Sequence, residues 1–504
     1  MSCTLEPTPT SYNGLPISTS NINSAISQLN EIVNDIMDIT KVPGISIAVV
    51  LCGDTVYANG FGVKNKTCCE PVDRLTVFPL AGLSESIGAT VIARVIAQSQ
   101  VKWKDPIIKY LPTFELSDKY VTENVTIGDM YCHRSGLPSL AGDSLEDLGF
   151  TQEEIIKRLR YVPLLSFRDE FRYVNFGPTI AATAVAVSQN VCWNELSKKA
   201  LYDPLCMAST FSTYQEFVCQ QNRVTPYRYN ILEGTWEESC YPRDPDEQSP
   251  TSGVSSNVTD LAEWMKLILS EGDYKIKIDT VVVDQMLTPR IPVKEPISDI
   301  DSRSTFYGFG IDWLVDSSGR VQFGHSGAFL LGASTHVTLL PSEQLGIVIL
   351  TNGGPIGIPE AISRIFFDIV EYGDTEYDWL KLLWERFSTL YQNPSILQNV
   401  DLSSYQVLCN HNKYVGKFEN KYYGKLKIKC EYNKLVLYLG KKKQFELMYW
   451  HDNIFYYCPT GENGKGITGV FFTDSLNCVK IENLEKDLNV FHRLKCKSSK
   501  KSKK

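Results

Sequence analysis

The spacing of apolar residues divides the chain into segments of different periodicity. Residues 21–39 carry apolar side chains three and four positions apart, which predicts an amphipathic helix with Asn21 or Ser24 as its N-cap. Residues 45–51 form a nearly continuous apolar run, and a turn at Gly53 separates them from a second apolar run. This arrangement predicts a β-hairpin whose first strand is buried on both faces.

The middle of the chain is predicted to be mainly helical. Residues 78–100 are small and apolar on all sides, which predicts a largely buried helix that starts near Gly82. Further helices are predicted over 152–160, 176–200 and 257–270. Strands return over 307–352, and an Ile-rich helix over 358–371 follows. Strands from both ends of this region are expected to pair in one antiparallel sheet with helices packed on it, an α+β architecture.

The periodicity changes again after a predicted helical connector. Residues 413–493 are rich in Tyr, Phe, Val and Ile in short alternating runs separated by turn residues, which is typical of a small β-barrel or sandwich. We therefore expect five parts: a flexible leader (1–20), a first domain (21–372), a helical connector (373–408), an all-β domain (409–494) and a basic tail (495–504).

Composition limits the classes of function. The chain has 504 residues, 43% of them hydrophobic, so it can bury a sizeable core. Its net charge of -8 argues against nucleic acid as the main partner.

The first twenty residues lack the apolar core of a signal peptide, and no run is long enough to span a membrane. A cytoplasmic location is expected, or a secreted one if the N-terminus is incomplete. The 14 cysteines form no CxxC units and the six histidines are scattered, so neither a metal nor a cofactor is predicted.

Four short polar motifs could carry chemistry, although each alone has an ordinary structural explanation. They are the helix start Gly82–Glu85, the loop His133–Pro138, the extended Tyr173-Val174-Asn175, and the strand end His325-Ser326-Gly327. In the extended segment, Tyr173 and Asn175 point to the same side because strand side chains alternate.

Taken together and in this order, the motifs resemble those of the penicillin-recognising serine hydrolases, which comprise class C β-lactamases, DD-peptidases and related esterases. The resemblance runs from about residue 26 to 372 and includes VPGISIAVV, DPIIKYLPTF, HRSGLP, RYVNFG, YGFGIDW and FGHSGAFLLGAST. The strands after residue 409 resemble the lipocalin-like domain that often follows this fold in bacterial and archaeal members.

The resemblance implies a mechanism and a set of residues. In the family, the serine of S-x-x-K attacks an acyl carbonyl and the lysine helps to remove its proton. The tyrosine of Y-x-N is a further base or proton relay, its asparagine holds the substrate amide, and two backbone N–H groups form an oxyanion hole. The matching positions here are Tyr173, Asn175, His325 and Gly327, with the oxyanion hole expected from the N–H groups of Gly82 and Ala328.

The first motif does not match. Gly82 occupies the serine position and Glu85 the lysine position. Glycine has no nucleophile, and a glutamate close to Tyr173 is expected to raise the pKa of that phenol. On a helix, Ser84 would point away from the site, whereas Ser86 would lie on nearly the right face but about 6 Å deeper.

Three hypotheses follow from this pattern. The first is a catalytically inactive pseudoenzyme that keeps a pocket for an acyl, peptide-like or β-lactam-like ligand. The second is a hydrolase with altered chemistry, in which Glu85 and Tyr173 activate water or Ser86 serves as a substitute nucleophile. The third is a structural or scaffolding protein with a vestigial pocket. The sequence leaves the ligand and the oligomeric state open.

Overall fold

The computed structural model describes residues 16–293, 305–316, 318–397, 410–441 and 443–495. Most of the expected leader and tail lies outside these residues. By its internal contacts the chain forms two compact units, each built from several segments. The first comprises Met1–Thr113, Glu123–Gly136 and Leu165–Thr389, and the second comprises Phe114–Thr122, Leu137–Leu164 and Leu390–Lys504. This grouping cuts across 21–372, so the expected domain bounds stay a prediction.

The first unit is built on an eight-stranded antiparallel sheet. Its order is β2-β1-β14-β13-β12-β11-β10-β9. The strands are β1 (Gly44–Leu51), β2 (Asp54–Gly62), β9 (Ile291–Val293), β10 (Thr305–Tyr307), β11 (Asp312–Val315), β12 (Val321–Phe329), β13 (Ala333–Leu340) and β14 (Leu345–Thr351). Ile45 pairs with Thr351, so strands from both ends of the region share the sheet, as expected. β1 is buried along almost its whole length, which also agrees with its apolar run.

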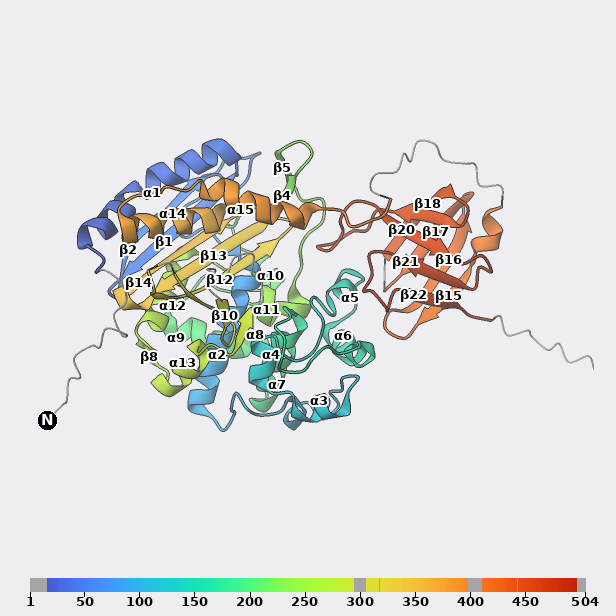
Figure 1. Cartoon of the computed structure of the whole chain (residues 1–504), viewed down its shortest axis with the longest axis horizontal. Helices are drawn as coiled ribbons and strands as arrows, with labels where there is room; N and C mark the ends of the chain where they lie inside the picture. Colours follow the sequence, from blue (N-terminus) through green and yellow to red (C-terminus); the bar gives the residue numbers. More distant parts are fainter. Residues whose placement is uncertain (1–15, 294–304, 317, 398–409, 442, 496–504) are drawn as a thin grey trace, which may run out of the picture. The chain divides into compact units, whose positions relative to one another are not determined.

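Helices cover both faces of this sheet (Figure 1). Helices α1 (Thr19–Thr40) and α14 (Ile358–Tyr372) lie together on one face, and α15 (Trp379–Phe387) packs against α14. On the other face, α12 (Val258–Leu269) packs on β1 and β14. The buried helix α2 (Ser84–Gln98) also belongs to this side and carries the candidate site at its N-terminus.

The remaining α-helices in the described part of the chain are short, with one exception. They are α3 (Lys119–Asn124), α4 (Ile127–Tyr131), α5 (Asp143–Asp147), α6 (Gln152–Arg158), α7 (Phe176–Ser188), α8 (Trp193–Ser197), α9 (Asp203–Leu205), α10 (Tyr214–Val218), α11 (Ser249–Ser252) and α13 (Thr280–Leu287). The single helix expected over 176–200 is wrong: α7 ends before Asn190, which has φ 56°, and α8 starts separately. The cap of α1 also differs, because Ser18 rather than Asn21 or Ser24 accepts the first hydrogen bond.

The second unit contains a closed antiparallel barrel of eight strands in chain order. They are β15 (Gly416–Asn420), β16 (Gly424–Glu431), β17 (Lys434–Leu439), β18 (Lys443–His451), β19 (Ile454–Tyr457), β20 (Thr468–Phe472), β21 (Cys478–Ile481) and β22 (Val490–Arg493). β22 closes the barrel by pairing with β15, so no strand edge is left open. Alternate strand residues fill its core, among them Phe418, Phe455 and Phe491, which are fully buried.

The segment that carries α5 and α6 packs on this barrel within the second unit. Ser144 donates to Glu485 (2.6 Å), and the Asp147 carboxylate accepts the backbone N–H groups of Glu462 (3.0 Å) and Asn463 (2.9 Å). The loop of the barrel at Glu462 and Asn463 therefore binds Asp147, which precedes it by some 300 positions in the sequence.

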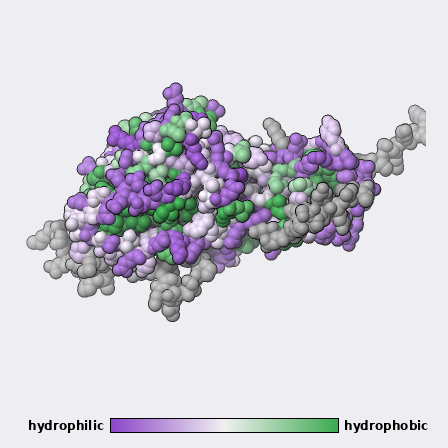
Figure 2. Space-filling view, turned by 90° about the horizontal axis from the view of Figure 1, so that it is seen from above, coloured by the Kyte–Doolittle hydropathy of each residue, from purple (hydrophilic) through white to green (hydrophobic). Residues whose placement is uncertain are grey.

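Hydrophobic residues on the surface occur in small groups among polar ones (Figure 2). Among the described residues, no helix is both long enough and apolar enough to cross a bilayer.

Candidate active site

Gly82 lies at the start of the buried helix α2, close to two other motifs. It is the middle residue of the 3₁₀ helix η2 (Ala81–Leu83), which leads directly into α2. A Cβ atom built on Gly82 would lie 3.2 Å from Tyr173 Oη and 3.0 Å from the Ser326 carbonyl oxygen. The structure thus brings Gly82, Tyr173 and β12 together, and a serine at position 82 would push its neighbours apart by a few tenths of an ångström.

Gly327 allows β12 to approach η2 this closely. A Cβ atom on Gly327 would lie 2.2 Å from the Leu80 carbonyl oxygen and 2.7 Å from the Leu83 backbone nitrogen. Thr335 on β13 fixes the same approach, because its hydroxyl donates to the Leu80 carbonyl oxygen (2.7 Å). Ala328, the next residue on β12, is exposed. Gly327 is thus packed against η2, and the next residue, Ala328, is accessible to solvent close to η2.

Glu85 is completely buried in the first turn of α2. Tyr307, at the end of β10, donates its hydroxyl to Glu85 Oε1 (2.9 Å). His133 Nε2 lies 3.0 Å from the same oxygen. The position that a lysine fills in S-x-x-K is therefore occupied by a carboxylate held inside the protein, where the positive end of the helix dipole favours a negative charge.

His325 joins this buried cluster from β12. Its Nε2 lies 2.8 Å from Tyr307 Oη, and its Nδ1 lies 2.8 Å from the carbonyl oxygen of Ser326. The matched third-motif histidine thus contacts Glu85 through a single tyrosine. Because strand side chains alternate, Ser326 faces the opposite side of the sheet, where its hydroxyl donates to Glu360 Oε1 (2.8 Å).

Several pKa values in the cluster are shifted by burial. Burial, and then the charge of Glu85, raises the pKa of Tyr307 well above its ordinary value. The same two causes raise the pKa of Tyr131, and burial also raises the pKa of Asp312. Tyr307 is therefore a hydrogen-bond donor at neutral pH. The rise expected for Tyr173 stays a prediction.

His133 also belongs to the cluster, although the sequence analysis gave its loop no specific role in the site. Its Nδ1 accepts the backbone N–H of Val174 (3.2 Å), which places the proton of a neutral ring on Nε2, facing Glu85. Its ring centroid lies 4.5 Å from that of Tyr173 and 5.1 Å from that of Tyr307. His133 therefore links the Y-x-N segment to the lysine position.

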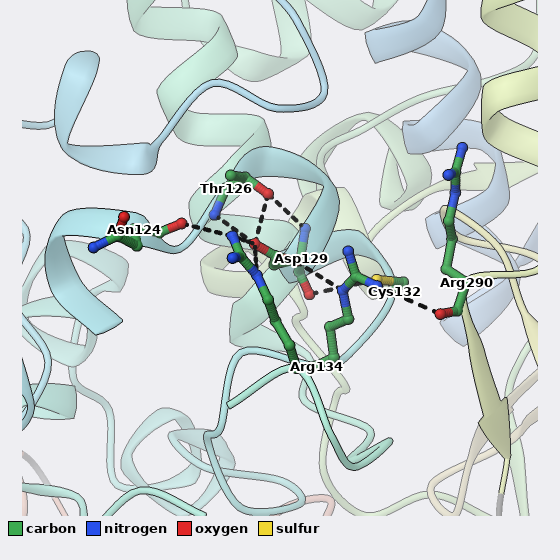
Figure 3. Close-up of polar contacts among 7 residues, drawn as sticks. Asn124, Thr126, Asp129, Cys132, Arg134 and Arg290 are labelled. Atoms are coloured by element: carbon green, nitrogen blue, oxygen red, sulfur yellow. Dashed lines mark hydrogen bonds and ion pairs between the residues drawn. The ribbon is translucent and has the colours of Figure 1, made fainter. Parts of the chain in front are cut away.

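The buried carboxylate of Asp129 forms ion pairs with two partly exposed arginines, which belong to the loops that carry His133 and Tyr173 (Figure 3). Asp129 on α4 accepts from Arg134 Nε at Oδ1 (2.7 Å) and from Arg168 Nη2 at Oδ2 (2.7 Å). Burial alone would raise the pKa of Asp129, but hydrogen bonds from Arg168 and Thr126 and the charge of Arg134 hold it below its ordinary value. Arg134 directly follows His133 and Arg168 precedes Tyr173 by five residues, so Asp129 positions both rings.

The outer part of the site is open to solvent. Gly82, Tyr173 and Asn175 are partly exposed and Ala328 is exposed, whereas Glu85 is completely buried. Asn175 lies just before α7, and its carbonyl oxygen accepts the hydroxyl of Thr251 (2.7 Å). Tyr173, Asn175 and Ala328 therefore form a solvent-facing surface, and the buried Glu85 cluster, which includes the matched His325, lies behind it.

The two serines near Gly82 are committed to backbone contacts. Ser84 is buried and its Oγ accepts the Val254 N–H (3.0 Å). Ser86 is 2% exposed, and its hydroxyl donates to the Gly310 carbonyl oxygen (2.6 Å). Neither hydroxyl faces the solvent side where Tyr173 and Ala328 lie.

A cavity of about 210 Å³ opens beside the same stretch of β12. Phe329, which follows Ala328, lines this cavity and packs on Ala81 and Ala333. The Arg243 guanidinium lies 4.8 Å from the Phe329 ring centroid. Other lining residues are mainly aromatic or apolar, with a second arginine: Tyr214, Phe217, Tyr241, Leu331 and Arg223. Because Glu238 also lines the cavity, it offers an apolar wall with two arginines and one glutamate beside Phe329.

Sequence reasoning identified one part of the cluster and missed another. It pointed to Gly82, Glu85 and His325, but it assigned no role to His133 or Tyr307. The available signal was their place in two landmark segments, HRSGLP and YGFGIDW. Among the described residues, no group of three His, Cys, Asp or Glu side chains is arranged to hold a metal ion.

The family model described as beta-lactamase matches residues 29–361, well over half of the chain. The chain belongs to the beta-lactamase family. Its family segment contains every residue of the cluster described above. Among solved structures, the octameric penicillin-binding protein homologue from Pyrococcus abyssi aligns with 92% of this chain and 99% of its own, with a TM-score of 0.62 at 21% identity, which shows a shared fold.

Sequence relatives of this beta-lactamase family member are distant. Unguisins hydrolase ungD' of Aspergillus campestris is 22% identical over 332 residues, 64% of this chain and 60% of the hydrolase, so the match leaves out a substantial part of that protein. Protein flp of Staphylococcus aureus is 20% identical over 357 residues, 69% of this chain and 68% of flp in strain COL. Gigasin-6 of Magallana gigas is 26% identical over 246 residues, 46% of this chain and 78% of its own length.

Proposed function

We propose that this beta-lactamase family member is a pseudoenzyme that binds an acyl or peptide-like ligand without turning it over. The observation that carries the proposal is the pair Gly82 and Glu85. Position 82 has no attacking atom and too little room for one without displacement of its neighbours. The general base position holds a buried carboxylate that accepts the Tyr307 hydroxyl, with His133 Nε2 at 3.0 Å from the same oxygen.

The solvent-facing surface supports retention of a ligand. Tyr173, Asn175 and Ala328 remain accessible beside Gly82, where backbone N–H groups would donate hydrogen bonds to a carbonyl oxygen of the ligand. The neighbouring cavity of about 210 Å³ would take an apolar or aromatic acyl group, and Arg223 and Arg243 would favour a ligand with a negative charge. Penicillins and acylated peptides with a free carboxylate have both properties.

The hydrolase alternative has less support from the geometry. Glu85 is sealed from solvent, so a water between Glu85 and Tyr173 would need the cluster to open. Ser86 would have to leave its bond to Gly310 and turn out of the core. Likewise, a purely structural role does not account for a cavity next to the accessible motif residues.

Covalent labelling tests the absence of turnover. The wild-type protein is treated with a fluorescent fluorophosphonate and, separately, with a fluorescent penicillin, and both are expected to leave it unlabelled. A nitrocefin assay is expected to give no hydrolysis above background. Stoichiometric labelling that disappears in Ser86→Ala would overturn the proposal in favour of the hydrolase alternative.

Thermal unfolding with benzylpenicillin tests the ligand site. Saturating ligand at 100 times its dissociation constant stabilises a protein by about 2.7 kcal/mol. Ser239→Trp would fill the cavity from its lining and is expected to abolish the shift. Thr235→Trp, at the exposed start of strand β5 (Thr235–Glu238) and outside the lining, should preserve it. An equal shift in both variants, or no shift with benzylpenicillin and N-acylated dipeptides in the wild type, would contradict the proposed site.

We also propose that the C-terminal barrel is lipocalin-like. Eight antiparallel strands that follow one another in chain order support this assignment. Its core is filled by aromatic side chains such as Phe418 and Phe455, which favours a structural role for this barrel.

A further inference from the structure

The buried cluster behind Gly82 contains a chain of hydrogen bonds whose protons can be counted. Tyr307 Oη lies between Glu85 Oε1 (2.9 Å) and His325 Nε2 (2.8 Å). His325 Nδ1 in turn lies 2.8 Å from the Ser326 carbonyl oxygen. Each of these three contacts needs one proton, and each group can supply only the protons that its chemistry allows.

The carbonyl of Ser326 only accepts, so His325 Nδ1 must carry a proton. Tyr307 has one hydroxyl proton for its two contacts. If it donates to Glu85, then His325 Nε2 must also be protonated and the ring is an imidazolium. If it donates to His325 instead, then Glu85 must be protonated. The two forms contain the same number of protons and interconvert when two protons shift along Tyr307.

The surroundings of Glu85 favour its ionised form. His133 Nε2 lies 3.0 Å from Glu85 Oε1, without the geometry of a hydrogen bond, and its other nitrogen accepts from Val174, so the proton of a neutral ring lies near the carboxylate. Glu85 also lies in the first turn of α2, where the helix dipole favours a negative charge. An ionised Glu85 accepts the Tyr307 proton at Oε1, so the contact between Tyr307 and His325 needs a second proton on His325 Nε2.

We infer that Glu85, Tyr307 and His325 form a charge-balanced relay in which His325 is an imidazolium paired with the Glu85 carboxylate through the Tyr307 hydroxyl. Compared with the S-x-x-K pattern, the positive charge has moved from the helix to β12, and the helix position carries the negative charge. This inference goes beyond the proposed function and does not depend on it.

The relay accounts for the joint occurrence of Glu85 and His325 in one buried site. A buried charge without a partner is costly, and each of these two groups offsets the other. It also means that restoring a lysine at position 85 alone would place an ammonium next to the histidine charge. His325 is a positioning residue here, since both of its nitrogens are engaged within the protein and neither faces the open surface.

Other titratable groups surround the pair, and the test must allow for them. Among the described residues they come from seven further places in the fold: Tyr131 on α4, His133 after it, Tyr173 before α7, Asp312 on β11, His336 on β13, Glu360 on α14 and Arg386 on α15. Burial lowers the pKa of His336 to about 3, so this neighbour stays uncharged at neutral pH.

Nitrogen NMR of the full chain, labelled with ¹⁵N at histidine, tests the relay at neutral pH. The signals of His325 are assigned by their loss in His325→Gln. In the wild type, both ring nitrogens of His325 are expected to carry protons and to have the similar shifts of an imidazolium. In Glu85→Gln, the Nε2 proton is expected to be lost, because the neutral amide no longer balances the charge.

Two further variants keep the result interpretable. Tyr307→Phe removes the connecting hydroxyl without adding a charge, and it is expected to discharge His325 even if Glu85→Gln does not fold. Glu360→Gln removes a buried carboxylate on the other face of β12 and should leave the imidazolium intact. A neutral His325 in the wild type would overturn the relay. An imidazolium that persists in both Glu85→Gln and Tyr307→Phe would overturn it as well.

Discussion

Glycines and buried carboxylates determine the candidate site at the scale of single residues. Gly327 permits β12 to approach the backbone of Leu80 and Leu83. A side chain at position 82 would crowd the hydroxyl of Tyr173. Glu85 and Glu360 lie on opposite faces of β12, and each is linked by hydrogen bonds to a residue of the H-S-G motif, Glu85 through Tyr307. Substitutions at the two glycines are therefore expected to change the stability of the fold, and substitutions at the two glutamates are expected to change the charge buried in it as well.

Gly327→Ala is expected to be strongly destabilising. The added methyl would lie 2.2 Å from the Leu80 carbonyl oxygen, and backbone on both sides must move to accept it. Overpacking of this kind typically costs about 1–3 kcal/mol, and contact with backbone places this variant at the upper end. Chemical denaturation gives the free energy of unfolding. Ala328→Ser, at an exposed neighbouring position, should change it by less than about 0.5 kcal/mol; equal values for the two variants would contradict the tight approach.

Glu360→Gln is expected to flatten the pH dependence of stability. Burial raises the pKa of Glu360 from 4.5 to about 7. The folded protein therefore holds a proton that the unfolded chain loses above pH 4.5, so the free energy of unfolding falls as pH rises through this window, by roughly 3 kcal/mol in total. Denaturation at several pH values between 4.5 and 8 measures this slope.

The glutamine variant keeps an oxygen that can accept from Ser326 but cannot ionise. The difference in slope between it and the wild type isolates Glu360 from other acids with raised pKa values, such as Glu371 and Asp246. Glu376→Gln, at an exposed position, serves as the control. Parallel curves for the wild type and Glu360→Gln would refute the assignment.

Sequence motifs predicted some residues of the candidate site and not others, and the difference has a physical reason. Gly82, Glu85 and His325 fall at fixed places in local motifs, so spacing locates them. The roles of His133 and Tyr307 depend on contacts with Glu85, which lies 48 residues from His133 and 222 residues from Tyr307, and no local pattern contains such contacts. A contact such as the one between Ser86 and Gly310 likewise becomes visible only in the folded chain.

At the scale of elements, periodicity located most helices and strands. It failed where a single residue's backbone conformation or packing against another segment determines where an element ends or whether it forms. The apolar run over 176–200 predicts one helix, but the left-handed Asn190 ends α7 within it. β22, which closes the barrel, falls at the end of the β-rich region 413–493. It is only four residues long and alternates with polar residues, so periodicity alone did not identify it as a separate strand. The helices α5 and α6 were predicted only in part, because their stability comes from packing on the barrel.

Asp147→Ala is expected to loosen the packing of α5 on the barrel. The carboxylate accepts the backbone N–H groups of Glu462 and Asn463, and its removal leaves two partly buried donors unpaired, at a cost of about 1–3 kcal/mol. Hydrogen exchange of these two amides should become faster. Glu153→Ala, which removes only an exposed pair with Lys157, should leave their exchange unchanged; the same loss of protection in both variants would argue against the contact.

At the scale of the whole molecule, the compact units do not follow the order of the chain. The second unit combines Phe114–Thr122 and Leu137–Leu164 with the C-terminal part. Several contacts tie its α5–α6 segment to the barrel, among them Ser144–Glu485, Asp147–Asn463, Glu154–Lys441 and Arg158–Tyr422. The barrel is thus a structural partner for residues that lie within the family segment.

A chain that ends at Thr389 is expected to become sensitive to proteolysis between residues 137 and 164. Without the barrel, this segment loses its partners and its apolar side chains are exposed to solvent, so it should open locally. Limited trypsin digestion with mass spectrometry would place the first cleavages there. A chain that ends at Leu494 retains the barrel and should resist cleavage in this segment; the same cleavage pattern in both chains would contradict the expected support.

The composition of the second unit also bears on how the protein folds during synthesis. Residues 137–164 leave the ribosome before the barrel strands that hold them, with more than 220 residues made in between. At 5–20 residues per second, this delay lasts roughly 10 to 50 s. During that interval the α5–α6 segment waits without its partner, and chaperones have their longest opportunity to bind it.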